Sequence, residues 1–284
     1  MKDDVFVVVG GSKAGGIGMG VTEVLSGYGK LVITGVTQAE VDEGNEYLKT
    51  KSIEAVSLVC DVLVREDVDK LIETAQGAGK IKGVAVITGL TPACPDWKLI
   101  MSVNLLSIIE LVKAFGEVME SGSSFVLFGS NSPYQLKRDM LDQTNDLLYG
   151  ADSDPDFIEK ISPFVLSSGA EMASNFAYPI SKRGVQLMAR KYAVILGEKG
   201  IRVNSVSPGT ADTLRNQELL PIVKSLYRMV NELTPSKRMG SVIEMGNVVA
   251  FLLSDQASFV SGIDILIDGA LAANMRLQKL VEQF

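Results

Sequence analysis

Tyr178 and Lys182 stand four residues apart, a spacing that puts both side chains on one face of a helix. A free tyrosine titrates at a pH of about 10, so it can act as an acid or base near neutrality only when positive charge close by stabilises its phenolate. Lys182 can supply that charge, and the pair is therefore a candidate proton-transfer site. A second pair of the same spacing, Tyr47 and Lys51, falls in a predicted surface helix, residues 39–51, where the two are expected to be ordinary neighbours.

A glycine-rich run at residues 10–18, Gly-Gly-Ser-Lys-Ala-Gly-Gly-Ile-Gly, lies between an apolar run and a predicted helix that extends to about Tyr28. Glycines let the backbone turn tightly and approach a phosphate, and a helix N-terminus offers free amide donors and a positive dipole end. The run therefore predicts a site for the pyrophosphate of a dinucleotide. The residues expected to contact it are Gly11, Ser12, Lys13, Gly16, Ile17 and Gly18.

The second predicted strand ends at residues 34–37 without the Asp or Glu that would hold both ribose hydroxyls and repel a 2′-phosphate. This absence favours NADP(H), with Lys13 as the positive charge and Thr37 as a hydroxyl donor. It leaves NAD(H) open, because Lys13 could equally be a solvated loop residue. Asp61 follows the third strand and could accept a hydrogen bond from the adenine amino group, or it could cap a predicted helix over residues 62–75.

Short β-rich runs recur along the chain, and helical patterns fill most of the gaps between them. This alternation predicts an α/β fold, a single domain over residues 1–284 with a doubly wound, seven-stranded parallel sheet. The strands are nearly all apolar, as expected when helices cover both faces, and ligands of such sheets bind at the carboxyl ends of the strands. The predicted strands are residues 5–9, 31–33, 55–59, 84–87, 125–128, 202–206 and 263–267.

Residues 132–175 break this rhythm, because they put a long stretch between a strand and the helix of Tyr178. We interpret them as an inserted substructure, either a solvated excursion with an apolar underside or a substrate lid. Residues 211–233 carry apolar side chains at helical spacing and are predicted to form a mobile flap over the substrate.

Composition excludes several classes of partner. The formal net charge of −7 argues against nucleic acid, since a phosphate backbone is bound by clustered Lys and Arg. With no His and only two cysteines, Cys60 and Cys94, the chain offers no metal cluster and no imidazole base. The apolar runs are too short to cross a bilayer, and we see no cationic and apolar leader. We therefore expect a cytoplasmic protein that binds no metal, membrane or nucleic acid.

Taken together, these motifs resemble those of the short-chain dehydrogenase/reductase family over nearly the whole chain. The insert and the last residues are similar to those of bacterial 3α-hydroxysteroid dehydrogenase/carbonyl reductases within it. Besides the glycine turn and the Tyr178–Lys182 pair, the matching positions are Asp61, Asn104, Ser130, residues 204–209 (Asn-Ser-Val-Ser-Pro-Gly), Thr213, residues 261–262 (Ser-Gly) and residues 267–269 (Ile-Asp-Gly).

The resemblance implies a Rossmann-fold, NAD(P)(H)-dependent enzyme that interconverts a secondary alcohol and a ketone. It also implies an apolar, hydroxysteroid-like substrate and a homodimer or homotetramer formed through the helices of Asn104 and Tyr178. In the implied mechanism Tyr178 exchanges a proton with the substrate oxygen and Ser130 orients that oxygen. Lys182 holds the nicotinamide ribose, and Asn104 binds a water that relays protons to Lys182. Further cofactor contacts are implied at Val62, Gly89, Pro208, Gly209 and Thr213.

The chain departs from the family pattern in three places, of which one is minor, residues 268–270 (Asp-Gly-Ala) in place of Asp-Gly-Gly. Its glycine turn, with glycines at positions 10, 16, 18 and 20, is longer than usual and is similar to that of the enoyl reductase branch; there, however, the active tyrosine lies seven residues before the lysine, where this chain has Asn175. The family's Asn-Asn-Ala-Gly after the fourth strand is replaced by residues 86–89, Val-Ile-Thr-Gly. Two alternatives stay open, an enoyl reductase and a nucleotide sensor without turnover. The second is disfavoured because a sensor has no need of proton-transfer groups.

Overall fold

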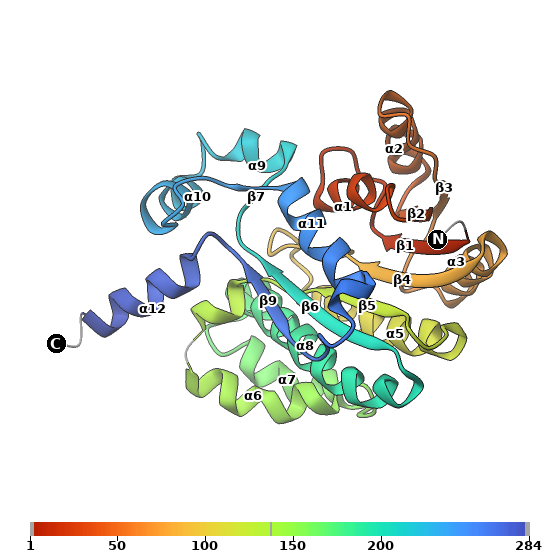
Figure 1. Cartoon of the computed structure of the whole chain (residues 1–284). Coiled ribbons are helices and arrows are strands. Elements are labelled where there is room, and N and C mark those ends of the chain that lie inside the picture. The colour runs from red at the N-terminus through yellow and green to blue at the C-terminus, as the bar shows by residue number, and fades with distance from the viewer. Residues whose placement is uncertain (1–2, 137, 282–284) are drawn as a thin grey trace.

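The computed structural model describes residues 3–136 and 138–281, and the side chains up to residue 278. Its centre is a seven-stranded sheet, all parallel, in the order β3-β2-β1-β4-β5-β6-β9 (Figure 1). The predicted seven-stranded α/β fold is therefore confirmed. The order reverses between β1 and β4, and the carboxyl ends of these two strands flank the glycine turn. The strands are β1 (Asp4–Val9), β2 (Lys30–Gly35), β3 (Val56–Val59), β4 (Lys80–Val86), β5 (Ser124–Phe128), β6 (Arg202–Pro208) and β9 (Asp264–Ile267).

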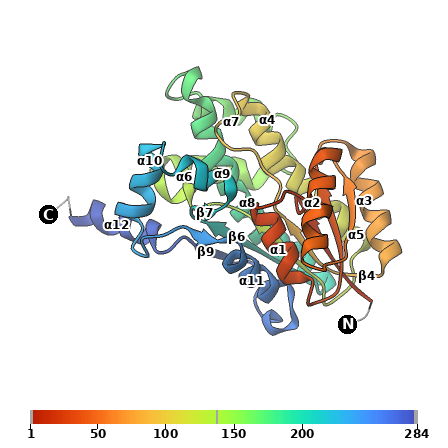
Figure 2. The ribbon, with the colours of Figure 1, turned by 90° about the horizontal axis from the view of Figure 1, so that it is seen from above.

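Helices cover both faces of the sheet, and seen from above they surround it (Figure 2). A short parallel pair, β7 (Ala211–Asp212) and β8 (Gly240–Ser241), lies outside the main sheet. The helices are α1 (Ile17–Leu25), α2 (Gln38–Thr50), α3 (Arg65–Ala78), α4 (Trp97–Met101), α5 (Ser107–Val118), α6 (Arg138–Gly150), α7 (Phe157–Val165), α8 (Ala173–Ile195), α9 (Leu214–Leu219), α10 (Lys224–Arg228), α11 (Val242–Leu253) and α12 (Leu271–Val281).

The two hydrophobic cores follow from the alternation of side chains along the strands. In β1, Val5, Val7 and Val9 belong to a core shared with α3, α5 and α8, whereas Phe6 and Val8 belong to a core shared with α1 and α11. Successive strand residues point to opposite faces, so a strand buried on both sides has to be apolar throughout. This explains the unbroken apolar runs in the sequence.

One long apolar helical stretch, Trp97–Val118, consists of α4, a π-helical segment (Ser102–Leu106) and α5. By length and composition it could span a membrane, but 61% of its most apolar window is buried inside the protein. Asn104 lies within the π-helical segment, between the regular helices α4 and α5.

The insert packs against the body rather than standing in solvent. Its helices α6 and α7 lie along α8 (Figure 1), and Phe157 and Ile161 are buried in the first core. Asp152, between α6 and α7, pairs with Lys191 at 2.7 Å and accepts a hydrogen bond from the Tyr192 hydroxyl at 3.1 Å. The insert is thus fastened to α8, the helix that carries Tyr178 and Lys182.

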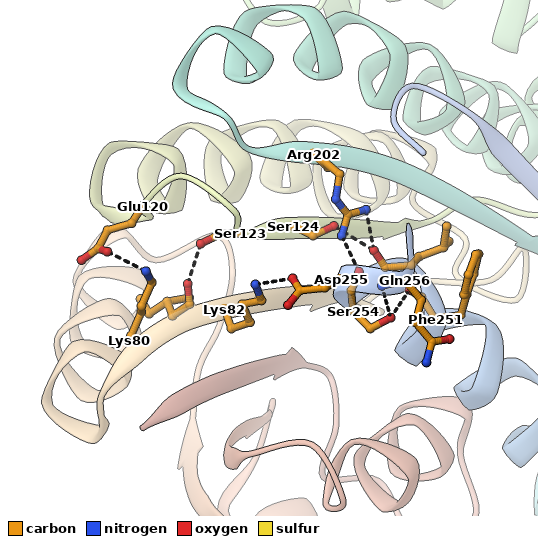
Figure 3. Close-up of polar contacts among 12 residues, drawn as sticks. Lys80, Lys82, Glu120, Ser123, Ser124, Arg202, Phe251, Ser254, Asp255 and Gln256 are labelled. Carbon is orange, nitrogen blue, oxygen red and sulfur yellow. Dashed lines mark hydrogen bonds and ion pairs between the residues drawn. The ribbon is translucent and has the colours of Figure 1, made fainter. Parts of the chain in front are cut away.

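The end of the sheet opposite the glycine turn is tied by polar contacts between layers, shown in Figure 3. The Arg202 guanidinium donates to the carbonyl oxygens of Leu252 at 2.7 Å, Ser254 at 3.0 Å and Val260 at 3.2 Å, at and beyond the carboxyl end of α11. Lys82 pairs with Asp255 at 2.7 Å. A cation at a helix C-terminus satisfies carbonyls that have no partner within the helix.

Residues 211–233, predicted as one amphipathic flap, are divided into β7, α9, α10 and a π-helical segment, Met229–Leu233. Pro221 lies between α9 and α10 and has no N–H to continue a helix. Three apolar side chains of this segment are exposed, Leu214 at 55%, Ile222 at 76% and Tyr227 at 53%.

Candidate active site

Tyr178 and Lys182 lie on the face of α8 that is turned toward the carboxyl end of β5. Lys182 is only 5% exposed, and its Nζ donates a hydrogen bond to the Phe128 carbonyl oxygen at 2.9 Å. Pro179 removes the N–H that would bond to the Asn175 carbonyl, and Ser181 Oγ donates to the Tyr178 carbonyl at 2.8 Å. The helix thus presents a buried ammonium group and a partly buried phenol one turn apart.

Burial governs the titration of both groups. It lowers the pKa of Lys182 to about 8, because the ammonium has left water without a carboxylate partner. Burial raises the pKa of Tyr178 above its usual value, and a hydrogen bond with the Ser130 hydroxyl opposes that rise. Tyr178 stays protonated at neutral pH, which is the form of a proton donor.

Ser130 follows β5 directly and is 7% exposed. Its hydroxyl hydrogen-bonds with Tyr178 and accepts from the Ser132 backbone N–H at 3.1 Å. The turn that carries it continues the ladder of the sheet, since the Asn131 N–H donates to the Pro208 carbonyl at 3.0 Å. Ser130 and Tyr178, 48 residues apart in the printed sequence, are thus brought together as predicted from the motifs.

Asn104 is fully buried and holds the segment after β4. Its Oδ1 accepts from the Leu90 N–H at 2.6 Å, and its Nδ2 donates to the Leu90 carbonyl at 2.9 Å and to Ser181 Oγ at 3.3 Å. A Cβ on Gly89 would lie 3.2 Å from both Asn104 Oδ1 and Lys182 Nζ. Asn104 therefore lies beside Lys182, with Gly89 leaving the space between them open.

The glycine turn has the compact form that the sequence indicated. Gly10 adopts a φ of 86°, and the Gly16 N–H donates to the Lys13 carbonyl at 3.1 Å. A Cβ on Gly18 would overlap the Gly10 carbonyl oxygen, so a side chain there would push the turn away from α1. Gly16 caps α1 without a side-chain hydrogen bond, which leaves the first amides of the helix for a ligand.

A cavity of about 620 Å³ opens above this turn. Of the residues predicted to bind the cofactor, those that line it are Lys13, Gly16, Ile17, Gly18, Val62, Gly89 and Thr213. Ser12 is fully buried, and its Oγ has no hydrogen-bond partner within residues 3–136 and 138–281. A buried hydroxyl without a partner, glycines that admit a close backbone approach and free helix amides fit a dinucleotide pyrophosphate.

Other predicted cofactor residues have partners within the protein. Thr37 caps α2 by accepting from the Glu40 N–H at 3.2 Å. Asp61 Oδ1 accepts from the Leu63 N–H at 2.9 Å in a turn that precedes α3, whose N-cap is Val64, so the alternative in which Asp61 caps this helix is wrong. The Gly209 N–H donates to the Ile267 carbonyl at 2.8 Å, and a Cβ there would meet Asp268. Gly11 is likewise packed, against Val8 and Thr22.

The cavity also contains residues that sequence reasoning missed. Glu40, in the first turn of α2, lines it and accepts from the Val36 N–H through Oε2 at 3.0 Å. This places a carboxylate at the end of β2, where the sequence had indicated none. Leu214 and Arg215 also line the cavity, and Leu214 packs against Gly15. Glu40 lies five residues beyond the end of β2, so its position in the sequence did not indicate a place at the strand end. It comes back to Val36 only because α2 begins directly after the strand.

Comparison with known proteins places these features in context. The sequence profile of the family described as "Enoyl-(Acyl carrier protein) reductase" matches residues 10–137 and 164–271. A short-chain dehydrogenase/reductase from Alternaria brassicicola is 28% identical over 96% of this chain and 97% of its own. A 3-alpha-hydroxysteroid dehydrogenase/carbonyl reductase from Comamonas testosteroni is 29% identical over 73% of this chain and 78% of its own. A short-chain type dehydrogenase/reductase from Mycobacterium ulcerans has the same fold, with a TM-score of 0.75, 21% identity and coverage of 96% and 91%.

Proposed function

Because the chain belongs to the short-chain dehydrogenase/reductase family of oxidoreductases, whose cofactor is NAD(H) or NADP(H), we propose that it interconverts a secondary alcohol and a ketone by hydride transfer. The observation that carries the proposal is the contact of Tyr178 with Ser130, beside the buried ammonium of Lys182. A nucleotide sensor would need none of these three groups. When bound, the nicotinamide cofactor supplies or accepts the hydride.

In the proposed reduction Tyr178 donates its proton to the ketone oxygen, and Ser130 donates a hydrogen bond that orients the same oxygen. Lys182 contributes positive charge as the phenolate forms, and the raised pKa of Tyr178 keeps the proton on its oxygen until the substrate takes it. In the reverse direction the same oxygen must first lose its proton. We therefore expect alcohol oxidation to need a higher pH than ketone reduction.

The direct test is an assay of the purified protein with NADH and NADPH, followed at the absorbance of the reduced nicotinamide. Steroid ketones, small ketones and enoyl thioesters are compared as substrates. Oxidation of the cofactor with a ketone is the expected result. Cofactor binding with no turnover of any class would overturn the proposal and favour the sensor.

The enoyl reductase alternative has two observations in its favour, the description of the matching family profile and the spacing of the glycine turn. The residue seven positions before Lys182 is Asn175, whose side chain is exposed and cannot act as the tyrosine of that branch. Tyr178 instead contacts Ser130. These contacts support carbonyl reduction, and turnover of enoyl thioesters alone would reverse this preference.

Among the described residues, three charged side chains line the cavity, those of Lys13, Glu40 and Arg215, and cofactor preference depends on them. The sequence favours NADP(H) through Lys13, but the carboxylate of Glu40 lies in the same cavity and would repel a 2′-phosphate. Replacing Glu40 by Gln keeps an oxygen for the Val36 N–H and removes the charge. We expect the ratio of kcat/KM with NADPH to kcat/KM with NADH to rise at least about tenfold, a change of roughly 1.4 kcal/mol.

The matched control is Glu43→Gln, since Glu43 lies on the same helix, is exposed and is remote from the cavity lining. It should leave the ratio within about twofold. In the opposite sense, Lys13→Ala should lower the ratio. An unchanged ratio in Glu40→Gln would show that the carboxylate does not face the 2′ position.

For the substrate we propose an apolar ketone of hydroxysteroid-like size. The exposed apolar side chains of Leu214, which lines the cavity, and of Ile222 and Tyr227 farther along the same segment support this, as does the similarity to the Comamonas protein. Exposed apolar side chains often mark a surface that a ligand covers, because binding removes them from water. The screen of steroid ketones against small polar ketones tests this directly.

We also propose a homodimer or homotetramer in the cytoplasm. The insert covers part of α8, where the sequence had placed the interface. The exposed side chains of Val194, near the carboxyl end of α8, and of Phe259 and Ile263, just before the edge strand β9, support a contact at that part of α8 and β9. Light scattering at several concentrations measures the assembly, and a monomer at all of them would contradict it. Cell fractionation tests the location.

A further inference from the structure

A buried glutamine on α8 joins the catalytic helix to the Ser130 turn. Gln186 follows Tyr178 and Lys182 at the same four-residue spacing and is 2% exposed. Its Nε2 donates to the Ser130 carbonyl at 3.3 Å and to Ser207 Oγ at 2.9 Å. Its Oε1 accepts from the Arg183 guanidinium at 3.3 Å. One amide thus connects α8, the turn after β5 and the strand β6.

The same turn is held a second time from β9. The Tyr134 hydroxyl donates to Asp264 Oδ2 at 3.1 Å, and Asp264 Oδ1 accepts from Ser205 at 2.6 Å and from Ser207 at 2.9 Å. Ser207 accepts from Gln186 and donates to Asp264, so the two sets of contacts form one network. The side chains of Gln186, Ser207, Asp264 and Tyr134 hold the turn over residues 130–134 from both ends, although Asn131 Nδ2 and Ser132 Oγ within the turn have no hydrogen-bond partner among the described residues.

The network also reaches the insert. Arg183 Nε donates to Asn145 Oδ1 on α6 at 3.0 Å. A continuous path of hydrogen bonds therefore runs from the insert through Arg183 and Gln186 to the backbone of Ser130. The proposed reaction uses none of these side chains directly, yet all of them are connected to its orienting serine.

We propose that Gln186 is a positioning residue that sets the distance between the Ser130 and Tyr178 hydroxyls. The inference rests on the proposed function, because those two hydroxyls share the substrate oxygen in it. Without the amide, the Ser130 carbonyl and Ser207 Oγ lose their donor in a buried place, and the turn has to shift to recover one. A displacement of about 1 Å at reacting groups can cost on the order of a hundredfold in rate.

The first test is Gln186→Leu, which keeps the volume and removes all three hydrogen bonds of the side chain. We expect kcat for ketone reduction to fall about 10- to 100-fold, with KM for the cofactor within about twofold, since its cavity is lined by other residues. Gln256→Leu is the matched control. Gln256 is exposed, at the opposite end of the sheet (Figure 3), and its change should leave kcat unaltered.

The second test, Gln186→Glu, separates positioning from packing. A protonated glutamate can donate to the Ser130 carbonyl, whereas an ionised one repels it. Arg183, with Arg190 near it, favours the ionised form of the new carboxyl group. Asp264 and burial favour its protonated form. Tyr134 and Arg276 lie beyond Asp264. Relative to the native enzyme, kcat of this variant should be near normal at low pH and fall as pH rises. The leucine variant should show no such pH dependence.

Hydrogen exchange of the peptide covering residues 129–136 gives a readout that needs no turnover. Faster exchange in Gln186→Leu than in Gln256→Leu is expected. A folded leucine variant with native kcat and native exchange would overturn the positioning role, even though the enzyme reduces ketones. Absence of ketone turnover in the native protein would overturn the proposed function instead, and the exchange comparison would still decide whether Gln186 holds the turn.

Discussion

Replacement of Tyr178 by phenylalanine is expected to lower kcat for ketone reduction at least about a hundredfold, because general acid catalysis contributes roughly 10²–10⁴-fold. The change deletes one oxygen and keeps the ring, so the packing of α8 is preserved. The lost hydroxyl is both the proton donor and the hydrogen-bond partner of Ser130. Cofactor affinity, measured by nicotinamide fluorescence, should change only a few-fold. Steady-state kinetics with the best ketone from the screen measures the effect.

The chain contains its own control for this change. Tyr47 has the same spacing to a lysine, its hydroxyl donates to Glu23 at 2.8 Å, and Lys51 lies over its ring at 5.4 Å. Tyr47→Phe should therefore leave ketone reduction within about twofold of native, as a surface change does. Ketone reduction retained in Tyr178→Phe would sink the assignment of the proton donor.

Replacement of Lys182 by methionine should abolish most of the activity and yet stabilise the cofactor-free protein. The loss of activity, at least about a hundredfold, follows from removing the positive charge beside Tyr178. The gain in stability follows from the pKa of Lys182, which burial lowers from 10.5 to about 8. A lowered pKa means that the unfolded chain binds the proton more tightly than the folded one.

The pH window follows from those values. Between about pH 8 and 10.5 the unfolded state carries more protons, so the free energy of unfolding of the native protein rises with pH over that range. At pH 7 the buried charge of Lys182 lowers the free energy of unfolding of the native protein by its full cost, on the order of 3 kcal/mol. Methionine avoids this cost but leaves the Phe128 carbonyl without its donor, which costs about 1–2 kcal/mol. The net gain at pH 7 is therefore on the order of 1–2 kcal/mol.

Urea unfolding at pH 7 and pH 10 measures this difference, and the advantage of the methionine variant should shrink at the higher pH. Lys199→Met is the matched control. The Lys199 ammonium also donates to a carbonyl, that of Gly116, at 3.1 Å, but its side chain is 49% exposed. No stabilisation is expected from that change. A Lys182→Met protein less stable than native at pH 7 would contradict the buried-charge argument.

The strands and the glycine turn could be predicted from the sequence because their signals are local. A strand buried on both faces is apolar throughout, and a pyrophosphate turn needs glycines between a strand and a helix. The Tyr178–Lys182 pair is local as well, since one helical turn connects them. For these elements the structure gives the exact positions, and it adds no residue to those that the sequence indicated.

Glu40 and Gln186 show where sequence reasoning stops. Each is an ordinary helix residue in the sequence, and its role depends on a contact with another segment that forms only when the chain folds. Glu40 returns to Val36 because α2 begins immediately after the strand, and Gln186 meets Ser130 from 56 positions away. The raised pKa of Tyr178 is similar, because the extent of burial is a property of the packed site and not of the motif.

The partnership of Tyr134 with Asp264 has a consequence for the making of the protein. The two residues are 130 positions apart, and Asp264 belongs to the last strand of the sheet. At a synthesis rate of roughly 5–20 residues per second, the Ser130 turn waits on the order of ten seconds or more for its second anchor. The arrangement of the catalytic serine is therefore completed only after β9 has been made.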